Sequence, residues 1–467
     1  MHWDYFLYLF IYFVLLLGVG SLFSPKMKNL EDFFLASRRL PASLVYLSVM
    51  ASWLGATSTL VSVDEAYAQG ISSFWVMGMP AVVTVLLFAV FLADPIRRLP
   101  IITLPDLVEM RYGRTVRHMA SLVIVWYMIL LASSQMVALG QFLKLFCGMP
   151  YLYSLMIGTG VVLVYSVLGG FFSVVLTDSL QFFFLGGGLL GLFVYFLGSV
   201  PVLHLPDQVS QAGKEGYFNF FLDVDKNLLI VLSFTLAWLI SPIVWQRIQS
   251  AQSAKKARKG LWAASGTFFL VYWCVVFAGM FALFLFPLGE IKGPLLSALI
   301  STKLGKVLGG ILFVAIVAAV MSTMDTAINT GAMSLTRDVF EKIILGRRLK
   351  HPVGASRGAT VLMGALAFLI AAQLESILKA LGLASEIMAE GLFIPGMAMI
   401  FLKKRRKMAG LLSLGFGGGY SVFGFLCQLG ILPFDFPSWP YSVPYGVGLC
   451  LGGFLLGWWV DTRGGMK

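Results

Sequence analysis

A stripe of hydroxyl, carboxylate and amide side chains inside an apolar segment is the part of this sequence best suited to chemistry. Within residues 307–335, Ser322, Asp325 and Asn329 are spaced to share one face of a helix. Three threonines repeat the spacing beside them: Thr323, Thr326 and Thr330. Hydroxyls and backbone carbonyls suit a hard cation, and hydroxyls do not titrate near neutral pH, so the stripe favours sodium over a proton. Hydrogen bonding between helices is the alternative.

A second unusual segment spans residues 42–62. Its middle, residues 51–59, gathers small and hydroxyl side chains around Trp53. Such a stretch can unwind and free backbone carbonyls where it lines a cavity in a membrane protein. A close helix–helix contact through Gly55 and Ala56 is the alternative.

Two carboxylates occupy a third apolar segment. Glu386 and Glu390 are four residues apart, so they lie on one face of a helix over residues 385–402. Ionisable groups at such depth favour a function, here a cationic solute or a gate. The alternative is a pair that extends its charges to the outer mouth of the protein.

Lipid must surround the elements that position these groups. Of the 467 residues, 59% are hydrophobic and 12% charged, whereas a soluble domain carries about 25% charge. Thirteen apolar segments are long enough to cross a bilayer. Their approximate cores are 5–23, 42–62, 72–93, 116–143, 151–167, 178–199, 227–246, 261–287, 307–335, 356–374, 385–402, 408–429 and 443–460. The first is interpreted as a retained helix, because no basic residue precedes it and no cleavage site follows.

The loops between these segments differ in charge. Alternating the thirteen spans puts 27 of the 34 lysines and arginines on one side and 7 on the other. Basic loops face the cytoplasm. The chain is therefore predicted to lie in the inner (plasma) membrane with its N-terminus outside and its C-terminus cytoplasmic.

Several classes of protein are disfavoured. The basic residues form short loop runs, so the net charge of +12 does not indicate nucleic-acid binding. The four cysteines are far apart, and no His/Cys/Asp cluster points to a metalloenzyme or a cofactor site. The longest loop, 200–226, is external, so no cytoplasmic output domain of a receptor is expected.

Six motifs in order resemble the sodium/solute symporter family, over about residues 30–407. They are Asp32 to Pro41, Arg97 to Gly113, Tyr165 to Gln181, Gln246 to Arg258, Ala319 to Asp338, and Gly391 to Pro395. Each motif alone is moderately specific, and their shared order makes the likeness strong.

The resemblance implies an all-α, LeuT-like fold with about 13 transmembrane helices and sodium-coupled symport of a small organic solute into the cell by alternating access. It implies no enzyme activity, no cofactor beyond the coupling sodium, and a chain that functions as a monomer. The implied divisions are an N-terminal helix and linker (1–40), a first five-helix repeat (41–199), an external loop (200–226), an inverted second repeat (227–402) and two further helices (403–467). A proton-coupled or facilitative carrier on this scaffold and a non-transporting solute sensor are the alternatives.

The family's shared sodium site maps onto both unusual segments. It implies carbonyl ligands from Ala51, Leu54 and Ala319, and hydroxyl ligands from Ser322 and Thr323. Asp178 matches an aspartate that some members use for a second sodium or for sodium release, and Asp325 would support either ion. A cap at the start of a helix is the alternative for Asp178.

The resemblance implies a solute site between the spans 42–62, 72–93, 116–143, 227–246, 261–287 and 385–402. The candidates here are Trp53, Thr57, Ser58, Trp126, Trp238, Ser241 and Glu390. Sugar-transporting members have polar groups where this chain has Trp53, Thr57 and Ala237, which disfavours a sugar. The run around Trp53 faintly resembles the choline-transporting branch, whose other cage aromatics are replaced here by Val82 and Ser241.

Overall fold

The computed structural model describes residues 3–22, 27–286, 293–373, 377–402, 404–428 and 430–464. These residues form helices and no strand, apart from one isolated bridge between Leu40 and Ala251, which confirms the all-α class. The first half of the chain contains α1 (Trp3–Leu22), α2 (Leu30–Leu35), η1 (Ala36–Arg38), α3 (Ala42–Trp53), η2 (Thr57–Val61), α4 (Ser62–Gln69), η3 (Gly70–Trp75), α5 (Gly78–Leu87), η4 (Phe88–Leu92), α6 (Ala93–Arg98), α7 (Leu104–Tyr112), α8 (Arg114–Cys147), α9 (Tyr151–Ser199), η5 (Val202–His204) and α10 (Leu205–Gln211).

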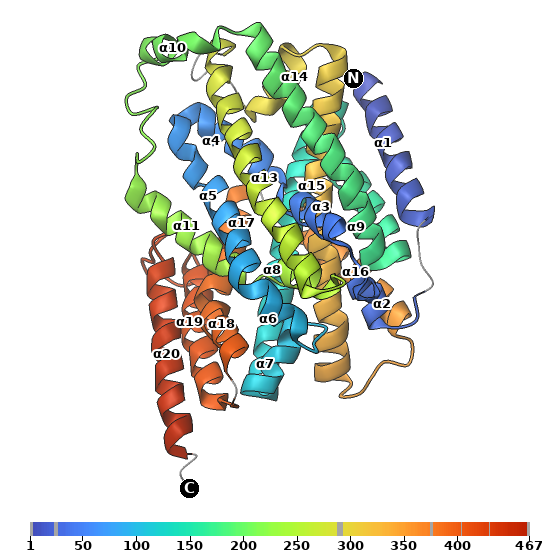
Figure 1. The fold of residues 1–467 in the computed structure, drawn as a ribbon, viewed down its shortest axis with the longest axis vertical. Coiled ribbons are helices and arrows are strands. Elements are labelled where there is room, and N and C mark those ends of the chain that lie inside the picture. Colours follow the sequence, from blue (N-terminus) through green and yellow to red (C-terminus); the bar gives the residue numbers. More distant parts are fainter. Residues whose placement is uncertain are drawn as a thin grey trace.

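The second half continues to the C-terminus in the same all-helical manner. It contains α11 (Val224–Leu239), α12 (Pro242–Ser250), α13 (Ala254–Phe281), η6 (Ala282–Phe284), α14 (Leu295–Thr302), α15 (Lys306–Ser334), η7 (Leu335–Ile344), α16 (Pro352–Ala371), α17 (Ile377–Ile387), η8 (Met388–Leu392), α18 (Phe393–Phe401), α19 (Lys407–Gln428) and α20 (Val443–Gly464). The two termini lie at opposite ends of the molecule (Figure 1).

Nine continuous helical stretches of the described chain are long and apolar enough to cross a membrane, or ten if the bent pair α11–α12 is one span. Two shorter apolar helices, Asp4–Gly20 and Ala42–Trp53, fall below that length. The chain is thus a multi-pass membrane protein. The count of thirteen spans stays a prediction, since some continuous stretches hold more than one crossing.

The long helix α9 is such a stretch. Its 49 residues would extend about 74 Å if straight, far beyond a hydrocarbon core of about 30 Å. It turns at Gly170, whose φ of 55° favours glycine. Before the turn, the Tyr165 hydroxyl donates to Asp325 of α15 at 2.5 Å. After the turn, Asp178 accepts from the guanidinium of Arg247, which also donates to Thr326 of α15. Residues before and after the turn therefore meet the same part of α15, so the chain doubles back between the predicted spans 151–167 and 178–199.

Two other spans are interrupted near their middle. The helix α3 ends at Trp53, and helical structure resumes at Thr57 as the wide turn η2, so the predicted unwinding is present. The helices α11 and α12 meet at a bend of 44°. Pro242 begins α12, where its missing N–H is harmless and its fixed φ suits a first helical residue.

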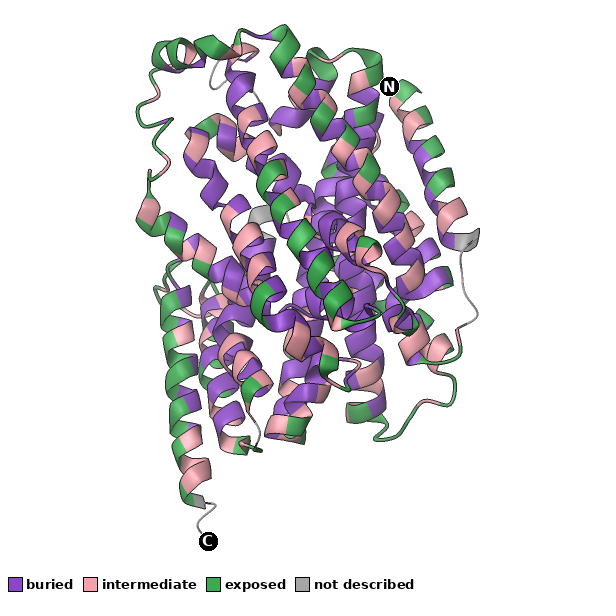
Figure 2. Cartoon of the chain, in the orientation of Figure 1, coloured by how far each residue is buried: buried purple, intermediate pink, exposed green. Residues whose placement is uncertain are grey.

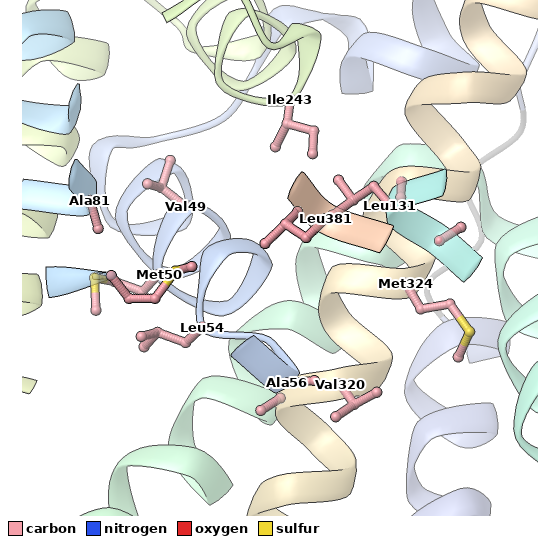
Figure 3. Packing of buried hydrophobic residues seen from close by; sticks show 14 of the residues in the cluster. Val49, Met50, Leu54, Ala56, Ala81, Leu131, Ile243, Val320, Met324 and Leu381 are labelled. Carbon is pink, nitrogen blue, oxygen red and sulfur yellow. The ribbon is translucent and has the colours of Figure 1, made fainter. Parts of the chain in front are cut away.

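The interrupted helices pack against a central pair. The spans of α8 and α15 are the most buried of the described candidates, and α20 the least. Figure 2 shows this as a buried interior flanked by exposed faces on α1 and α20. Near the break in α3, buried apolar side chains from several helices form one cluster, whose members include Leu54 and Ala56 of the broken span and Val320 of α15 (Figure 3).

An ionic network that the sequence did not reveal fixes α7, α8 and η7 to one another. The buried Arg117 donates to Asp338 at 2.6 Å and to Asp106 at 3.1 Å, and it also pairs with Glu109. Thr103 donates to the same Asp338 oxygen at 2.8 Å. This network holds the base of the central helices in a fixed arrangement.

Candidate functional site

The two polar segments singled out in the sequence meet at the break in α3. The Ser322 hydroxyl lies 2.8 Å from the Ala51 carbonyl oxygen and 2.9 Å from that of Ala319. The Thr323 hydroxyl lies 3.3 Å from the Ala319 carbonyl. All of these groups are buried. Uncharged oxygens from α3 and α15 therefore converge on one small region.

The backbone between the two halves of this span leaves the helical path for identifiable reasons. Leu54 has a ψ of 59°, which turns its carbonyl away from the helix direction. The Ala56 N–H donates at 2.9 Å to Oε1 of Gln135 on α8. At Gly55, a Cβ would lie 2.6 Å from Gln135 Oε1 and 2.6 Å from Thr323 Oγ1. The absence of a side chain at Gly55 thus lets the broken turn approach α8 and α15 closely.

Gln135 is a site residue that sequence reasoning missed. Its amide accepts from Ala56 and donates to Ser134 at 3.1 Å. The available signal was a neutral amide in an otherwise apolar span, which is an expensive residue in lipid. Gln135 therefore provides an acceptor for the Ala56 N–H, a backbone group that the break would otherwise leave without a hydrogen-bond partner.

A cavity of about 50 Å³ adjoins this region on the side of the broken α11–α12 pair. It is lined by Ser52, Trp53, Gly55, Thr57, Ser58, Met77, Tyr127, Leu131, Gln135, Trp238, Ser241, Ile243, Tyr272, Thr323 and Leu381. Five predicted solute residues are among them: Trp53, Thr57, Ser58, Trp238 and Ser241. Thr323 belongs both to this lining and to the oxygen cluster, so the two sites share a residue.

Aromatic rings and hydroxyls define the chemistry of this cavity. The rings of Trp53 and Trp238 lie 5.0 Å apart between centroids. Ser58 shares a hydrogen bond of 2.7 Å with the hydroxyl of Tyr272 on α13, a lining residue that the sequence did not predict. The lining residues include no acidic, basic or histidine side chain. The N-terminal ends of η2 and α12 and the C-terminal ends of α3 and α11 border the cavity, and they supply partial charges of both signs.

The structure places two predicted solute residues elsewhere. Trp126 lines a different cavity, between α8, α17 and α19, because it lies about 100° around α8 from Tyr127, which faces the solute cavity. Glu390 lies in η8 and packs against Gly417 of α19 and Gly446 of α20. Neither contributes to the lining of the solute cavity.

The carboxylates of α17 and η8 do not reach the outer mouth of the protein. Glu386 is 4% and Glu390 1% exposed. The interpretation of an extended, solvated pair is therefore wrong, because neighbouring helices cover both side chains.

Asp178 and Asp325 lie in one buried network. Ser48 donates to Asp178 at 2.6 Å, and Arg247 donates to it at 3.2 Å. The same guanidinium donates to the Thr326 hydroxyl at 2.7 Å. One oxygen of each aspartate has no hydrogen-bond partner among the described residues. The alternative of a helix cap for Asp178 is wrong, because the turn that precedes its helix lies at Gly170, eight residues earlier.

Known proteins share this architecture and much of this sequence. A family model described as "Sodium:solute symporter family" matches residues 33–417. A sodium/glucose cotransporter of Vibrio parahaemolyticus is 28% identical over 84% of this chain and 78% of its own. The high-affinity choline transporter 1 of Drosophila melanogaster is 24% identical over 89% and 70%. The sodium/proline symporter of Staphylococcus aureus is 24% identical over 79% and 74%.

Solved structures share the fold. A substrate-bound, outward-open Na⁺-coupled sialic acid symporter superposes with a TM-score of 0.82 at 20% identity, covering 97% of each chain. MhsT in complex with L-phenylalanine gives a TM-score of 0.55 at 15% identity, covering 90% of this chain and 97% of its own. These likenesses confirm the predicted LeuT-like fold.

A methyl group at Gly55 tests the close approach at the break. Gly55→Ala places a Cβ 2.6 Å from two fixed polar atoms, so we expect overpacking that destabilises the protein by about 1–3 kcal/mol. The measurement is the melting temperature of the purified protein in detergent. Gly186→Ala is the matched control, because nothing lies within 4 Å of a Cβ there. Equal melting temperatures for the two variants would contradict the proposed packing role of Gly55.

Proposed function

The chain belongs to the sodium:solute symporter family, and from that premise we propose that sodium bound at the break in α3 drives uptake of a small organic solute held against Trp53 and Trp238. Sodium-coupled symport is the function class of the family and of its relatives, and the chain is not an enzyme. The observation that carries the proposal is Thr323, which belongs to the oxygen cluster and also lines the solute cavity.

The oxygen cluster fits sodium by its chemistry. Its members are the carbonyls of Ala51 and Ala319 and the hydroxyls of Ser322 and Thr323, the last two buried on α15. The carbonyl of Leu54, at the break in α3, is proposed as the fifth ligand. All five are uncharged oxygens, which a weakly charged hard cation accepts without a competing proton. When sodium binds, the hydroxyl protons of Ser322 and Thr323 point away from the ion, and their oxygen lone pairs face it.

Coupling follows from which helices the ion joins. Sodium between α3 and α15 stabilises the arrangement in which the solute cavity is complete. It drives transport only if its affinity differs between the outward-open and inward-open states. Moving one charge across about 100 mV contributes roughly 2.3 kcal/mol, and a roughly tenfold sodium gradient adds about 1.4 kcal/mol. One sodium therefore supports a several-hundredfold gradient of a neutral solute.

The cavity favours a small solute without net charge. Its volume of about 50 Å³ is well below the roughly 300 Å³ at which drug-sized pockets begin, so the cavity must widen for any larger solute. Helix ends of both signs and the two tryptophan rings suit a small zwitterion with an apolar face. Among the relatives' solutes, proline meets this description better than glucose or sialic acid.

A second cation is proposed at the network of Asp178 and Asp325. Among the described residues, Asp178 pairs with the guanidinium of Arg247 and Asp325 has no ion pair, so one negative charge stays uncompensated when both aspartates are ionised. An uncompensated charge in a membrane interior is expensive. A sodium ion or a proton bound between Asp178 and Asp325 would neutralise it during the transport cycle.

The chain organisation extends the proposal. Residues 41–199 and 227–402 are proposed as the two inverted repeats, supported by a broken span at the start of each. The chain is proposed to work as a monomer, with its N-terminus outside and its C-terminus cytoplasmic. A cysteine placed at the exposed Ser210 tests that orientation. Its labelling in intact cells by an impermeant thiol reagent would support an external loop, and a lack of labelling would indicate the opposite orientation.

Melting temperatures in sodium and in potassium test the function. A ligand that binds only the folded state raises stability by mass action. We expect sodium to raise the melting temperature, and one small zwitterion from a panel of amino acids, betaines, carboxylates and sugars to raise it further only in sodium. Solutes that act equally in potassium would contradict sodium coupling and favour a facilitative or proton-coupled carrier.

Removing either hydroxyl tests the sodium site. Ser322→Ala and Thr323→Ala each delete one proposed ligand, so we expect apparent sodium affinity to fall roughly tenfold or more, which corresponds to about 1.4 kcal/mol. The measurement is sodium-dependent uptake into proteoliposomes. Ser356→Ala is the control, because its buried hydroxyl bonds only its own helix, at Pro352. Sodium dependence that is unchanged in both site variants would exclude the site.

Neutralising Asp325 tests the second cation. Asp325→Asn removes the uncompensated charge, so we expect the Hill coefficient for sodium in uptake to fall toward one if the second cation is sodium. If it is a proton, the pH dependence of uptake should weaken instead. Unchanged sodium cooperativity together with an unchanged pH profile would restrict Asp325 to its hydrogen bond with Tyr165.

A further inference from the structure

A second cavity lies between α8, α17 and α19, apart from the solute cavity. Its volume is about 290 Å³. It is lined by Leu122, Val123, Trp126, Leu130, Glu386, Ile387, Ser421, Val422 and Phe425. The lining is apolar except for one carboxylate and one hydroxyl, and it shares no residue with the solute cavity.

The carboxylate in this lining has no cation of its own. Glu386 is 4% exposed and accepts a hydrogen bond of 2.6 Å from Ser442. No lysine, arginine or histidine forms a salt bridge with Glu386 or with its neighbour Glu390 among the described residues. A carboxylate in an apolar membrane interior is stabilised by a cation that can reach it. The cavity provides the space for such a cation beside Glu386.

Two aromatic rings line the same cavity as this carboxylate. Trp126 and Phe425 meet edge to face, with centroids 6.0 Å apart and ring planes at 72°. Indole and phenyl faces attract ammonium groups, most strongly where water is excluded. From the carboxylate, the two rings and the apolar walls together, we propose that this cavity binds an amphiphilic organic cation, with its ammonium group at Glu386 and Trp126.

The cavity rim indicates the route of entry. Leu122 is 58% and Val422 48% exposed, and both belong to apolar spans, so the rim opens toward the lipid. A lipophilic ammonium compound partitions into that region. A plain acyl chain would fill the space but leave Glu386 without a cation.

A metal ion is a poor alternative occupant. Among the described residues, no group of three or more His, Cys, Asp and Glu could hold a metal ion.

An occupant of this cavity would act on the wall of the solute cavity. Two adjacent residues of α8 line different cavities. Leu130 lines the second cavity, and Leu131 lines the solute cavity. One helix, α17, likewise contributes Leu381 to the solute cavity and Glu386 to the other. A bound cation would therefore hold α17 against α8 and change the rate of solute uptake.

A pair of isosteric compounds tests this site. Phenyltrimethylammonium carries the charge, and tert-butylbenzene has the same shape without it. Binding to the purified full chain in phosphatidylcholine nanodiscs is followed by the rise in melting temperature with compound concentration. We expect the cation to stabilise the protein and the neutral compound not to. Glu386→Gln and Trp126→Leu should each weaken apparent binding of the cation at least tenfold.

Trp53→Leu in the solute cavity is the control, and it should change binding of the cation less than twofold. Equal stabilisation by both compounds, loss of binding in Trp53→Leu, or unchanged binding in Glu386→Gln and Trp126→Leu would each overturn the proposal. If Glu386→Gln does not elute as a single species with a cooperative melt, Trp126→Leu decides the outcome. None of these results depends on sodium, so they are separate from the tests of symport.

Discussion

An interrupted helix in a membrane interior persists only when its freed backbone groups find partners, because lipid offers none. The break between Trp53 and Thr57 meets that constraint through two neighbouring helices. Gln135 of α8 accepts the Ala56 N–H, and Ser322 of α15 lies against the Ala51 carbonyl. The two most buried spans of the described chain are thus the ones that hold the break. The rest of the molecule surrounds this contact.

The same constraint shapes the charged interior. Arg247 is fully buried, yet its guanidinium contacts Asp178, Thr326 and the carbonyls of Ser48 and Ile243. It therefore ties α12 to α3, α9 and α15 beside the oxygen cluster. At the base of α8, Arg117 likewise joins two elements, because it donates to Asp338 of η7. Each buried arginine has several acceptors, which is the arrangement in which a buried charge is tolerated.

Residue types predicted the break in the span 42–62, because hydroxyls and small residues are conspicuous in apolar spans. The family resemblance, rather than residue types, indicated that this span meets α15, and the bend between α11 and α12 was not predicted. The direction of single side chains was harder to predict. Trp126 and Tyr127 are neighbours in sequence, but they line different cavities. Which cavity each side chain lines depends on how α8 is rotated about its axis relative to α19. The hydrogen-bond partner of Glu386 is also distant in sequence: it is Ser442, which directly precedes α20. Such contacts depend on packing between helices, which neither composition nor spacing determines.

Two further sets of contacts join segments that lie far apart in the chain. The Leu295 N–H of α14 donates to Asp64 of α4 at 2.7 Å. Arg38 of η1 donates to Gln249 of α12 and, at 2.7 Å, to the Ile101 carbonyl. Because the solute cavity measures only about 50 Å³, passage of a solute requires the helices around that cavity to move apart.

The contacts of Arg38 rest on unusual backbone geometry. Ala36, Ser37 and Arg38 have consecutive φ values of 47°, 51° and 55°, in the left-handed region that side chains other than glycine disfavour. Each such residue raises the energy of the local fold by on the order of 1–3 kcal/mol. The hydrogen bonds of Arg38 offset that strain while they are formed. Once they separate, relaxation of the turn opposes their re-formation, so these contacts are held by a small difference between opposing terms. A small difference of this kind is within reach of the binding energy of one sodium ion and one solute.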